Sequence, residues 1–175
     1  MSNYSNNMYK EYKKMQSKKD LIILSHLRQN SREPLTIMSR NTTIPVSTIF
    51  DRIKAHQQDQ LITRFTALLD FPSLGYPTRV HVMLKVHKDD RDNVRQTLLI
   101  HKHVNSAYRI SNGYDYLIEG IFETIKDVEN FLEHLEEHHR IQAKQVYYII
   151  DDLKREAFLS NPEYVKITYQ AEKEV

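Results

Sequence analysis

The chain has no cysteine among its 175 residues. Disulfide frameworks, thiolate metal sites and cysteine nucleophiles are therefore excluded. No apolar run has the length of a signal peptide or a membrane span, so we expect a soluble, cytoplasmic protein that needs no membrane. Glycine occurs only three times, and no glycine-rich phosphate loop, nucleophile elbow or paired-carboxylate motif is present. We therefore predict no enzyme activity, no catalytic residue and no cofactor.

Charge is unevenly distributed, although the formal net charge is only +2. The first 65 residues contain eleven lysines and arginines against five acidic residues, whereas the remainder contains fourteen against eighteen. The first part is basic and the second part is acidic. This asymmetry suits a DNA-binding head joined to a body that meets other protein or small molecules.

Three short helices are predicted in the basic part. The first begins near Asp20, the second runs from Pro34 to about Arg40, and Pro45 opens the third. Apolar residues recur three and four positions apart, which is the period of an amphipathic helix. Tight polar turns join the helices, as in a trihelical core.

The third predicted helix carries groups suited to DNA on the face opposite its apolar stripe, to which we assign Ile49, Phe50 and Ile53. Small hydrogen-bonding groups near its start, with cations behind them, match base edges and phosphates. The candidate DNA-contacting residues are Ser47, Thr48, Asp51, Arg52 and Lys54 on this helix, Arg64 beyond it, and Arg40 and Thr43 just before it. A solvated helix face is the alternative interpretation, and Arg52 has another, an ion pair with Asp51 or Asp59.

Residues 61–69 follow the third helix and have a sequence typical of an extended segment, with Arg64 at its centre. We predict a strand there. Three helices followed by a basic strand are the order of a winged helix-turn-helix.

The acidic part alternates strand and helix patterns after a linker that contains proline and glycine. The predicted elements, in order, are a strand over 79–86, a helix over 89–100, strands over 103–111 and 114–122, a helix over 124–139 and a strand over 143–150. Asn112 and Gly113 form a two-residue hairpin signal between the middle strands. The order βαββαβ closes into an antiparallel ferredoxin-like sheet with both helices on one face. We expect an α+β protein.

Such a sheet leaves its other face bare. Residues such as Met83, Tyr116 or Leu117, and Tyr148 or Ile149 are too apolar to remain in water. A second copy would cover them, so we predict a two-fold homodimer. It would set two recognition helices about one DNA turn apart, or a multiple of it, on a pseudo-palindromic site.

The head resembles that of the Lrp/AsnC family, and its archaeal branch is the most similar. The matching residues are Asp20, Ile23, Leu24, Leu27, Arg32, Met38, Ser39, Ile44, Pro45 to Ile53, Leu61, Ile62 and Thr66 to Leu69. Family members commonly have glycine where this chain has Thr43 and Gln60. Because threonine resists a positive φ, we expect the turn before the third helix to take a different route.

The acidic part resembles the RAM domain of the same family, which senses ligands and oligomerises. Ser111, Tyr114 and Asp115 match the family's loop pattern, while Asn112 occupies the position where the family usually has glycine, and Gly113 follows it. In relatives an amino acid binds near this loop at a contact between dimers. The resemblance therefore gives Asn112, Gly113 and Asp115 as candidate effector contacts, and implies dimers that assemble into tetramers or octamers. A plain hairpin turn is the alternative.

The resemblance implies a sequence-specific transcriptional regulator that binds double-stranded DNA. Our domain assignment is an N-terminal arm (1–17), a winged helix-turn-helix domain (18–70), a linker (71–78), a RAM domain (79–151) and a C-terminal extension (152–175). Two alternatives share this layout: a metabolite-sensing protein whose head does not touch DNA, and a sirohaem decarboxylase. Tyr108 and Arg109 stand in the strand where decarboxylases have a His and a Tyr-x-Arg-like pattern, but no histidine is close by in that strand.

Nine histidines raise the question of a metal site. The groupings are His101 with His103, and His134 with His138 and His139. Imidazoles four positions apart on a helix can chelate a metal. The predicted topology puts the two groupings at opposite ends of the sheet, so we predict no metal centre and interpret them as solvated residues at helix ends.

Overall fold

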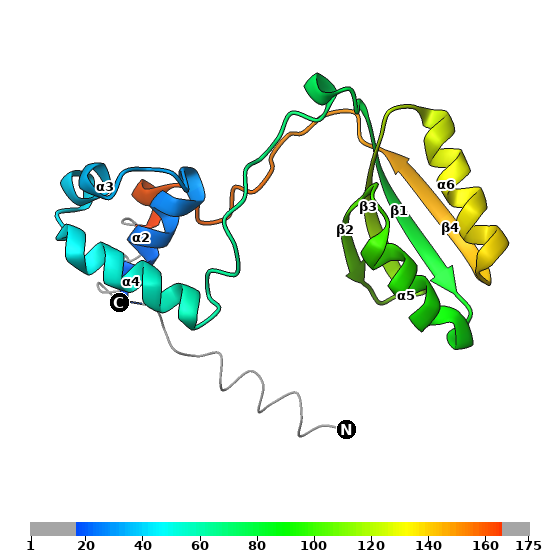
Figure 1. Cartoon of the computed structure of the whole chain (residues 1–175), viewed down its shortest axis with the longest axis horizontal. Helices are drawn as coiled ribbons and strands as arrows, with labels where there is room; N and C mark the ends of the chain where they lie inside the picture. The colour runs from blue at the N-terminus through cyan, green and yellow to red at the C-terminus, as the bar shows by residue number, and fades with distance from the viewer. Residues whose placement is uncertain (1–16, 166–175) are drawn as a thin grey trace. The chain divides into compact units, whose positions relative to one another are not determined.

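The computed structural model describes residues 17–165, so the arm predicted over 1–17 lies almost entirely outside the described residues. The chain divides into two compact units. Within the described residues, one unit contains residues 17–67 and 154–165, and the other is Leu68–Leu153 (Figure 1). Between these limits no helix combines the length and the apolar character that a membrane span needs.

The head unit contains the three predicted helices. They are α2 (Lys18–Gln29), α3 (Leu35–Thr42) and α4 (Val46–Gln58) (Figure 1). Each helix starts at a local signal, because Ser17 caps α2, and Pro34 and Pro45 immediately precede α3 and α4.

The core of the head is small and apolar. Its buried members are Ile23, Met38, Ile44 and Ile49, with Leu27, Leu35 and Ile53 packed partly against them. Each fully buried side chain of this size contributes about 2 kcal/mol. Phe50, which we predicted in the apolar stripe, is 55% exposed. It stands one residue, or about 100°, around α4 from the buried Ile49, so that part of the prediction is wrong.

The turn between α3 and α4 has the left-handed backbone conformation that the threonine at position 43 was expected to disfavour. Thr43 has φ 59° and ψ 16°, and Gln60, just after α4, also has a positive φ of 57°. Local hydrogen bonds support the first turn: the Thr43 hydroxyl donates to the Thr42 carbonyl at 2.6 Å, and the Thr42 hydroxyl accepts from the Ile44 amide at 3.3 Å. The expectation that Thr43 would divert the turn is wrong.

The strand predicted over residues 61–69 is not formed. Between α4 and the second unit the structure assigns no strand, and nearly all of these residues are exposed. An isolated extended segment has no ladder partner, and a strand needs one to be stable. Leu61, Phe65, Leu68 and Leu69 are each about half exposed, at 46%, 47%, 57% and 51%.

The C-terminal segment returns to the head. The Arg28 guanidinium on α2 donates to the carbonyls of Glu156 and Phe158 at 3.0 and 3.1 Å, and pairs with the Glu156 carboxylate at 2.9 Å. Val165, near the end of the described residues, is buried. Residues 154–165 therefore belong to the head unit, although the sequence assigned them only to an extension.

The second unit has the predicted βαββαβ order. Its elements are β1 (Thr78–Val86), α5 (Arg91–Ile100), β2 (Val104–Arg109), β3 (Tyr116–Phe122), α6 (Ile125–His138) and β4 (Ile141–Tyr148) (Figure 1). The short 3-10 helices Pro72–Leu74 and Lys88–Asp90 precede β1 and α5. The strands form one antiparallel sheet in the order β2-β3-β1-β4, and residues of both helices share one core with it. The α+β ferredoxin-like prediction is confirmed.

The register decides which side chains face the side of the sheet away from α5 and α6. Met83 pairs with Leu117, one residue away along each strand from the buried Leu84, Tyr116 and Ile118, so Met83 and Leu117 point to the other face. Tyr116 belongs to the core, and its hydroxyl donates to the Arg91 carbonyl at 2.9 Å. Of the two alternatives in β3, Leu117 is therefore the residue on the open face.

Candidate nucleic-acid interface

Helix α4 buries one side and presents a polar side. Ile49 and His56 are buried, whereas Ser47, Asp51 and Lys54 are exposed. These three recur four and three positions apart and so share one face of the helix. Within residues 17–165 their side chains make no hydrogen bond or ion pair, which leaves them available to a partner.

The Asp20 carboxylate on α2 links this helix to α4. It accepts from Arg52 Nη1 at 2.5 Å and lies 3.1 Å from His56 Nε2, and both of these residues belong to α4. Ser17 closes the group through a capping box with Asp20. Burial by itself would raise the pKa of Asp20, but hydrogen bonds from Ser17 and Arg52, together with the charge of Arg52, outweigh it and lower the pKa to about 2.

The partner of Arg52 lies outside its own stretch of sequence. The expected ion-pair partners, Asp51 and Asp59, are its neighbours in sequence, but the structure pairs it with Asp20, 32 residues away. Its side chain remains 34% exposed. The Ser-x-x-Asp pattern at Ser17 was a detectable capping signal, whereas no local pattern indicated the link to α4.

The remaining DNA candidates lie on exposed segments. Arg40 is in the last turn of α3, Thr43 is in the turn, and Arg64 lies in the segment after α4 that has no strand partner. All three are exposed. The turn brings Arg40 and Thr43 to the N-terminal end of α4, where Ser47 and Thr48 lie. Arg64 follows the other end of that helix.

An apolar hollow of about 260 Å³ lies beside the polar face of α4. Leu27, Leu35, Phe50, Ile53 and Phe65 supply its apolar wall, and Lys54 and Gln57 stand at it. Phe50, which is 55% exposed, is one of the apolar side chains at this hollow.

The loop with the candidate effector contacts has the turn geometry that the sequence predicted. Asn112 and Gly113 both have positive φ, 68° and 94°, as a type I′ turn requires. Asp115 is held within the fold: its carboxylate accepts from the Val86 amide at 2.8 Å and pairs with Arg91 at 2.8 Å. The three candidates are adjacent in the chain, but only Asn112 and Gly113 are exposed.

A cavity of about 430 Å³ lies next to this loop, between α5 and β2. Lys88, Arg91, Arg95 and Arg109 contribute four positive charges to its lining, Asp92 contributes one negative charge, and Tyr108 and Tyr116 contribute rings. The Nε atom of Arg91 is buried and has no hydrogen-bond partner within the described residues. Sequence reasoning missed this cavity because its cations come from three different elements.

The histidine groupings lie closer together than the sequence analysis predicted. The His101 ring packs on Phe131 of α6, with centroids 4.6 Å apart. Burial lowers the pKa of His101, and the charges of His103 and His134 lower it further. His134 therefore lies within electrostatic range of His101, whereas His139 contacts Thr97 and Asp90, so the predicted separation of the two groupings holds for His139 but not for His134.

Comparisons with known proteins agree with this architecture. A family profile described as "Lrp/AsnC ligand binding domain" matches residues 79–158. The HTH-type transcriptional regulator FL11 of Pyrococcus horikoshii is 26% identical over 114 residues, which cover 65% of this chain and 76% of that protein. The HTH-type transcriptional regulator LrpC of Bacillus subtilis is 22% identical over 113 residues, covering 65% and 78%.

Solved structures share the fold over most of both chains. A Neisseria meningitidis transcriptional regulator in complex with L-methionine superposes with a TM-score of 0.75 at 22% identity, covering 80% of this chain and 93% of that one. AsnC of E. coli superposes with a TM-score of 0.72 at 18% identity, covering 81% and 96%. Residues 79–158 therefore form a domain of the Lrp/AsnC ligand-binding type, and the chain is similar over about two thirds of its length to HTH-type transcriptional regulators.

Proposed function

We propose that this transcription regulator binds specific double-stranded DNA sites through α4 and does so as a dimer. The observation that carries the proposal is the exposed face formed by Ser47, Asp51 and Lys54, whose side chains have no partner within the described residues. Hydroxyl and carboxylate groups near the start of the helix suit base edges, and the lysine suits a phosphate. The regulator acts in the cytoplasm, where it meets DNA.

The other candidate DNA contacts differ in how exposed their side chains are. Arg40, Thr43 and Arg64 are exposed, and Thr48 is half-buried beside Ser47. Asp20 occupies Nη1 of the Arg52 guanidinium, so only the remaining exposed part of this group is available to DNA. We therefore assign phosphate contacts to Lys54, Arg40 and Arg64, and give Arg52 a main role in holding α4 on the head.

Dimerisation is supported by the open face of the sheet. Met83 and Leu117 form a cross-strand apolar pair there, and apolar side chains are costly to leave in water. A second copy placed on this face by two-fold symmetry would bury the pair and present two α4 helices to one pseudo-palindromic site.

Effector binding is supported by the cavity between α5 and β2. An amino acid carries one carboxylate and one ammonium, and the lining offers Arg91 and Arg95 to the first and Asp92 to the second. The volume of about 430 Å³ falls in the range of small-ligand sites. The L-methionine complex of the Neisseria relative makes amino acids the first ligands to test.

Selection from a random duplex library, followed by binding measurements on the selected site, tests the proposal. We expect the full chain to enrich a pseudo-palindromic sequence and to bind it far more tightly than a scrambled duplex of the same composition. Enrichment of no sequence, or equal affinity for both duplexes, would contradict specific DNA binding. A thermal-shift screen of the common amino acids, with Arg95→Ala as the cavity variant, tests the effector separately.

A further inference from the structure

The last two turns of α6 contain two histidines and a glutamate that the proposed function does not use. His134, Glu137 and His138 are all exposed, and their potential ligand atoms lie within 4.8 Å of one another. Positions i, i+3 and i+4 of a helix project from one side of it. We propose that these three side chains form a binding site for a divalent transition-metal ion, with zinc as the reference ion.

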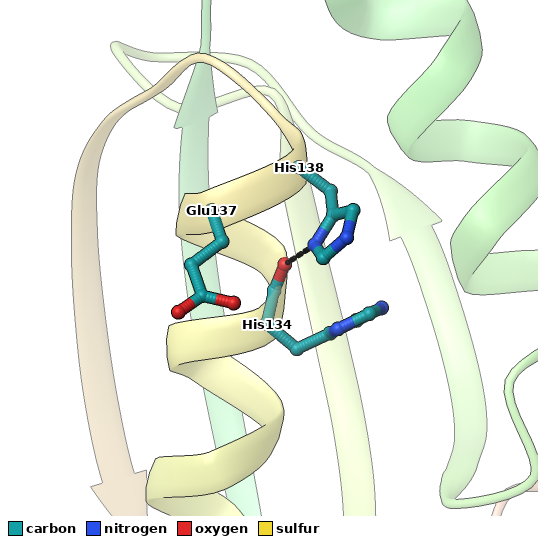
Figure 2. A group of neighbouring side chains, drawn as sticks. All are labelled: His134, Glu137 and His138. Carbon is teal, nitrogen blue, oxygen red and sulfur yellow. Dashed lines mark hydrogen bonds between the residues drawn. The ribbon is translucent and has the colours of Figure 1, made fainter.

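Figure 2 shows the arrangement. The two imidazoles stand one turn apart with ring centroids 4.1 Å from each other, and the Glu137 side chain leaves the same turn of the helix. Ligand atoms around a tetrahedral ion with bonds of about 2.1 Å lie roughly 3.4 Å apart. All three side chains are exposed, so they have room to rotate toward that separation.

A hydrogen bond prepares one of the imidazoles for a metal. The Nδ1 atom of His138 lies 2.9 Å from the His134 carbonyl oxygen (Figure 2). A carbonyl oxygen only accepts, so Nδ1 carries the proton and the lone pair of the neutral ring is on Nε2. This is the arrangement in which metal-binding histidines are commonly held, with one ring nitrogen donating to a carbonyl and the other free for the ion.

Two other histidines of this unit, His139 and His103, are held by contacts of their own. His139 Nε2 is hydrogen-bonded to Thr97 at 2.9 Å, and its other ring nitrogen faces the carboxylate of Asp90 at 3.5 Å. His103 Nδ1 is hydrogen-bonded to the Ile121 carbonyl, and its ring is stacked on Phe122. Both rings are part of the packing of the unit.

The donor set determines the class of ion. Two imidazoles and one carboxylate favour zinc, nickel, copper and cobalt over magnesium and calcium, which prefer all-oxygen sites. Three protein ligands leave at least one position to water. The site is open to solvent, so we expect weaker binding than at a closed structural site.

Isothermal titration of the full chain with zinc chloride at pH 7.5 tests the site. We expect one ion per chain at this site, and more than tenfold weaker binding in His134→Ala and in His138→Ala. Glu137→Gln is expected to weaken binding several-fold. Glu133→Gln is the matched control, because it removes one exposed charge from the same helix outside the ligand set, and it is expected to bind as the wild type does.

Cobalt absorption gives an independent readout. Bound cobalt is expected to give visible bands that are lost in His134→Ala and that disappear at pH 5, where protons compete for imidazole. Circular dichroism of each variant confirms that the exposed substitutions leave α6 folded. Unchanged zinc affinity in both histidine variants would overturn the proposal, as would loss of binding in Glu133→Gln equal to that in Glu137→Gln. The DNA-binding proposal stands or falls separately, because none of these residues belongs to the head.

Discussion

Replacing Asp20 with asparagine is expected to destabilise the head by about 2 kcal/mol at pH 7. The pKa of Asp20 is lowered from an ordinary value of 3.8 to about 2, and each pKa unit corresponds to about 1.36 kcal/mol of preference for the charged form. The carboxylate is nearly buried and holds Arg52 and His56 of α4. Asparagine removes the charge that these groups pair with but keeps a similar shape.

The sign of the pH dependence follows from the lowered pKa. The stabilisation from Asp20 is fully present above about pH 4 and is lost as the pH falls through 2, because the carboxylate is then protonated in the folded and the unfolded head alike. The difference between wild type and Asp20→Asn is therefore expected to be about 2 kcal/mol at pH 7 and to shrink strongly at pH 2. Asp51→Asn, an exposed change on α4 at a side chain with no partner among residues 17–165, is the control and is expected to stay within about 0.5 kcal/mol.

The measurement has to report on the head alone, because a chain with two compact units need not unfold in one step. Urea unfolding followed by the methyl NMR signals of Ile23 and Ile49, which are buried in the head core, meets this need. Ile118 of the second unit serves as the internal reference. A loss below about 0.5 kcal/mol at pH 7, or an equal loss at pH 7 and pH 2, would refute the assignment of Asp20 as the charged link between α2 and α4.

Three further outcomes are expected. Thr43→Gly is expected to raise head stability by about 0.5–1 kcal/mol in the same assay, because the left-handed backbone costs a β-branched residue more than glycine loses in entropy; a loss of stability would show that the local hydrogen bonds dominate. Lys54→Ala is expected to weaken binding to all duplexes alike and to reduce the slope of log affinity against log salt by about one, and an unchanged slope would remove Lys54 from the phosphate contacts. Leu117→Asp is expected to shift the chain toward a monomer in sedimentation velocity, since it puts a charge on the open sheet face; an unchanged oligomer would place the dimer contact elsewhere.

Periodic patterns predicted most of the fold. The helices of the head and the βαββαβ order came from apolar spacing, which local sequence encodes directly. Positive φ at Asn112 and Gly113 was likewise predictable, because that residue pair favours one turn type. The observed ends of the elements differ from the predicted ends by only a few residues. For example, β2 ends at Arg109, whereas the prediction placed its end at Ser111.

The features that the sequence did not predict depend on distant partners. The Asp20 link joins residues more than 30 positions apart, and no periodicity relates them. The left-handed Thr43 shows that packing of α3 on α4 can override the preference of a single residue. The strand predicted over 61–69 is not formed although its local sequence pattern is suitable, because no partner strand exists in the described chain. The cavity between α5 and β2 collects cations from separate elements, and only the fold brings them together.

Methylation interference on the selected duplex tests most directly the claim that α4 reads DNA in the major groove. Methylation of guanine N7 adds a group to the major groove only, so it should block a helix that lies there. We predict interference in two segments separated by about one DNA turn or a multiple of it, with the effect at one position of each segment weakened by Ser47→Ala combined with Thr48→Ala. Tight binding without major-groove interference, or interference in a single segment, would contradict the account.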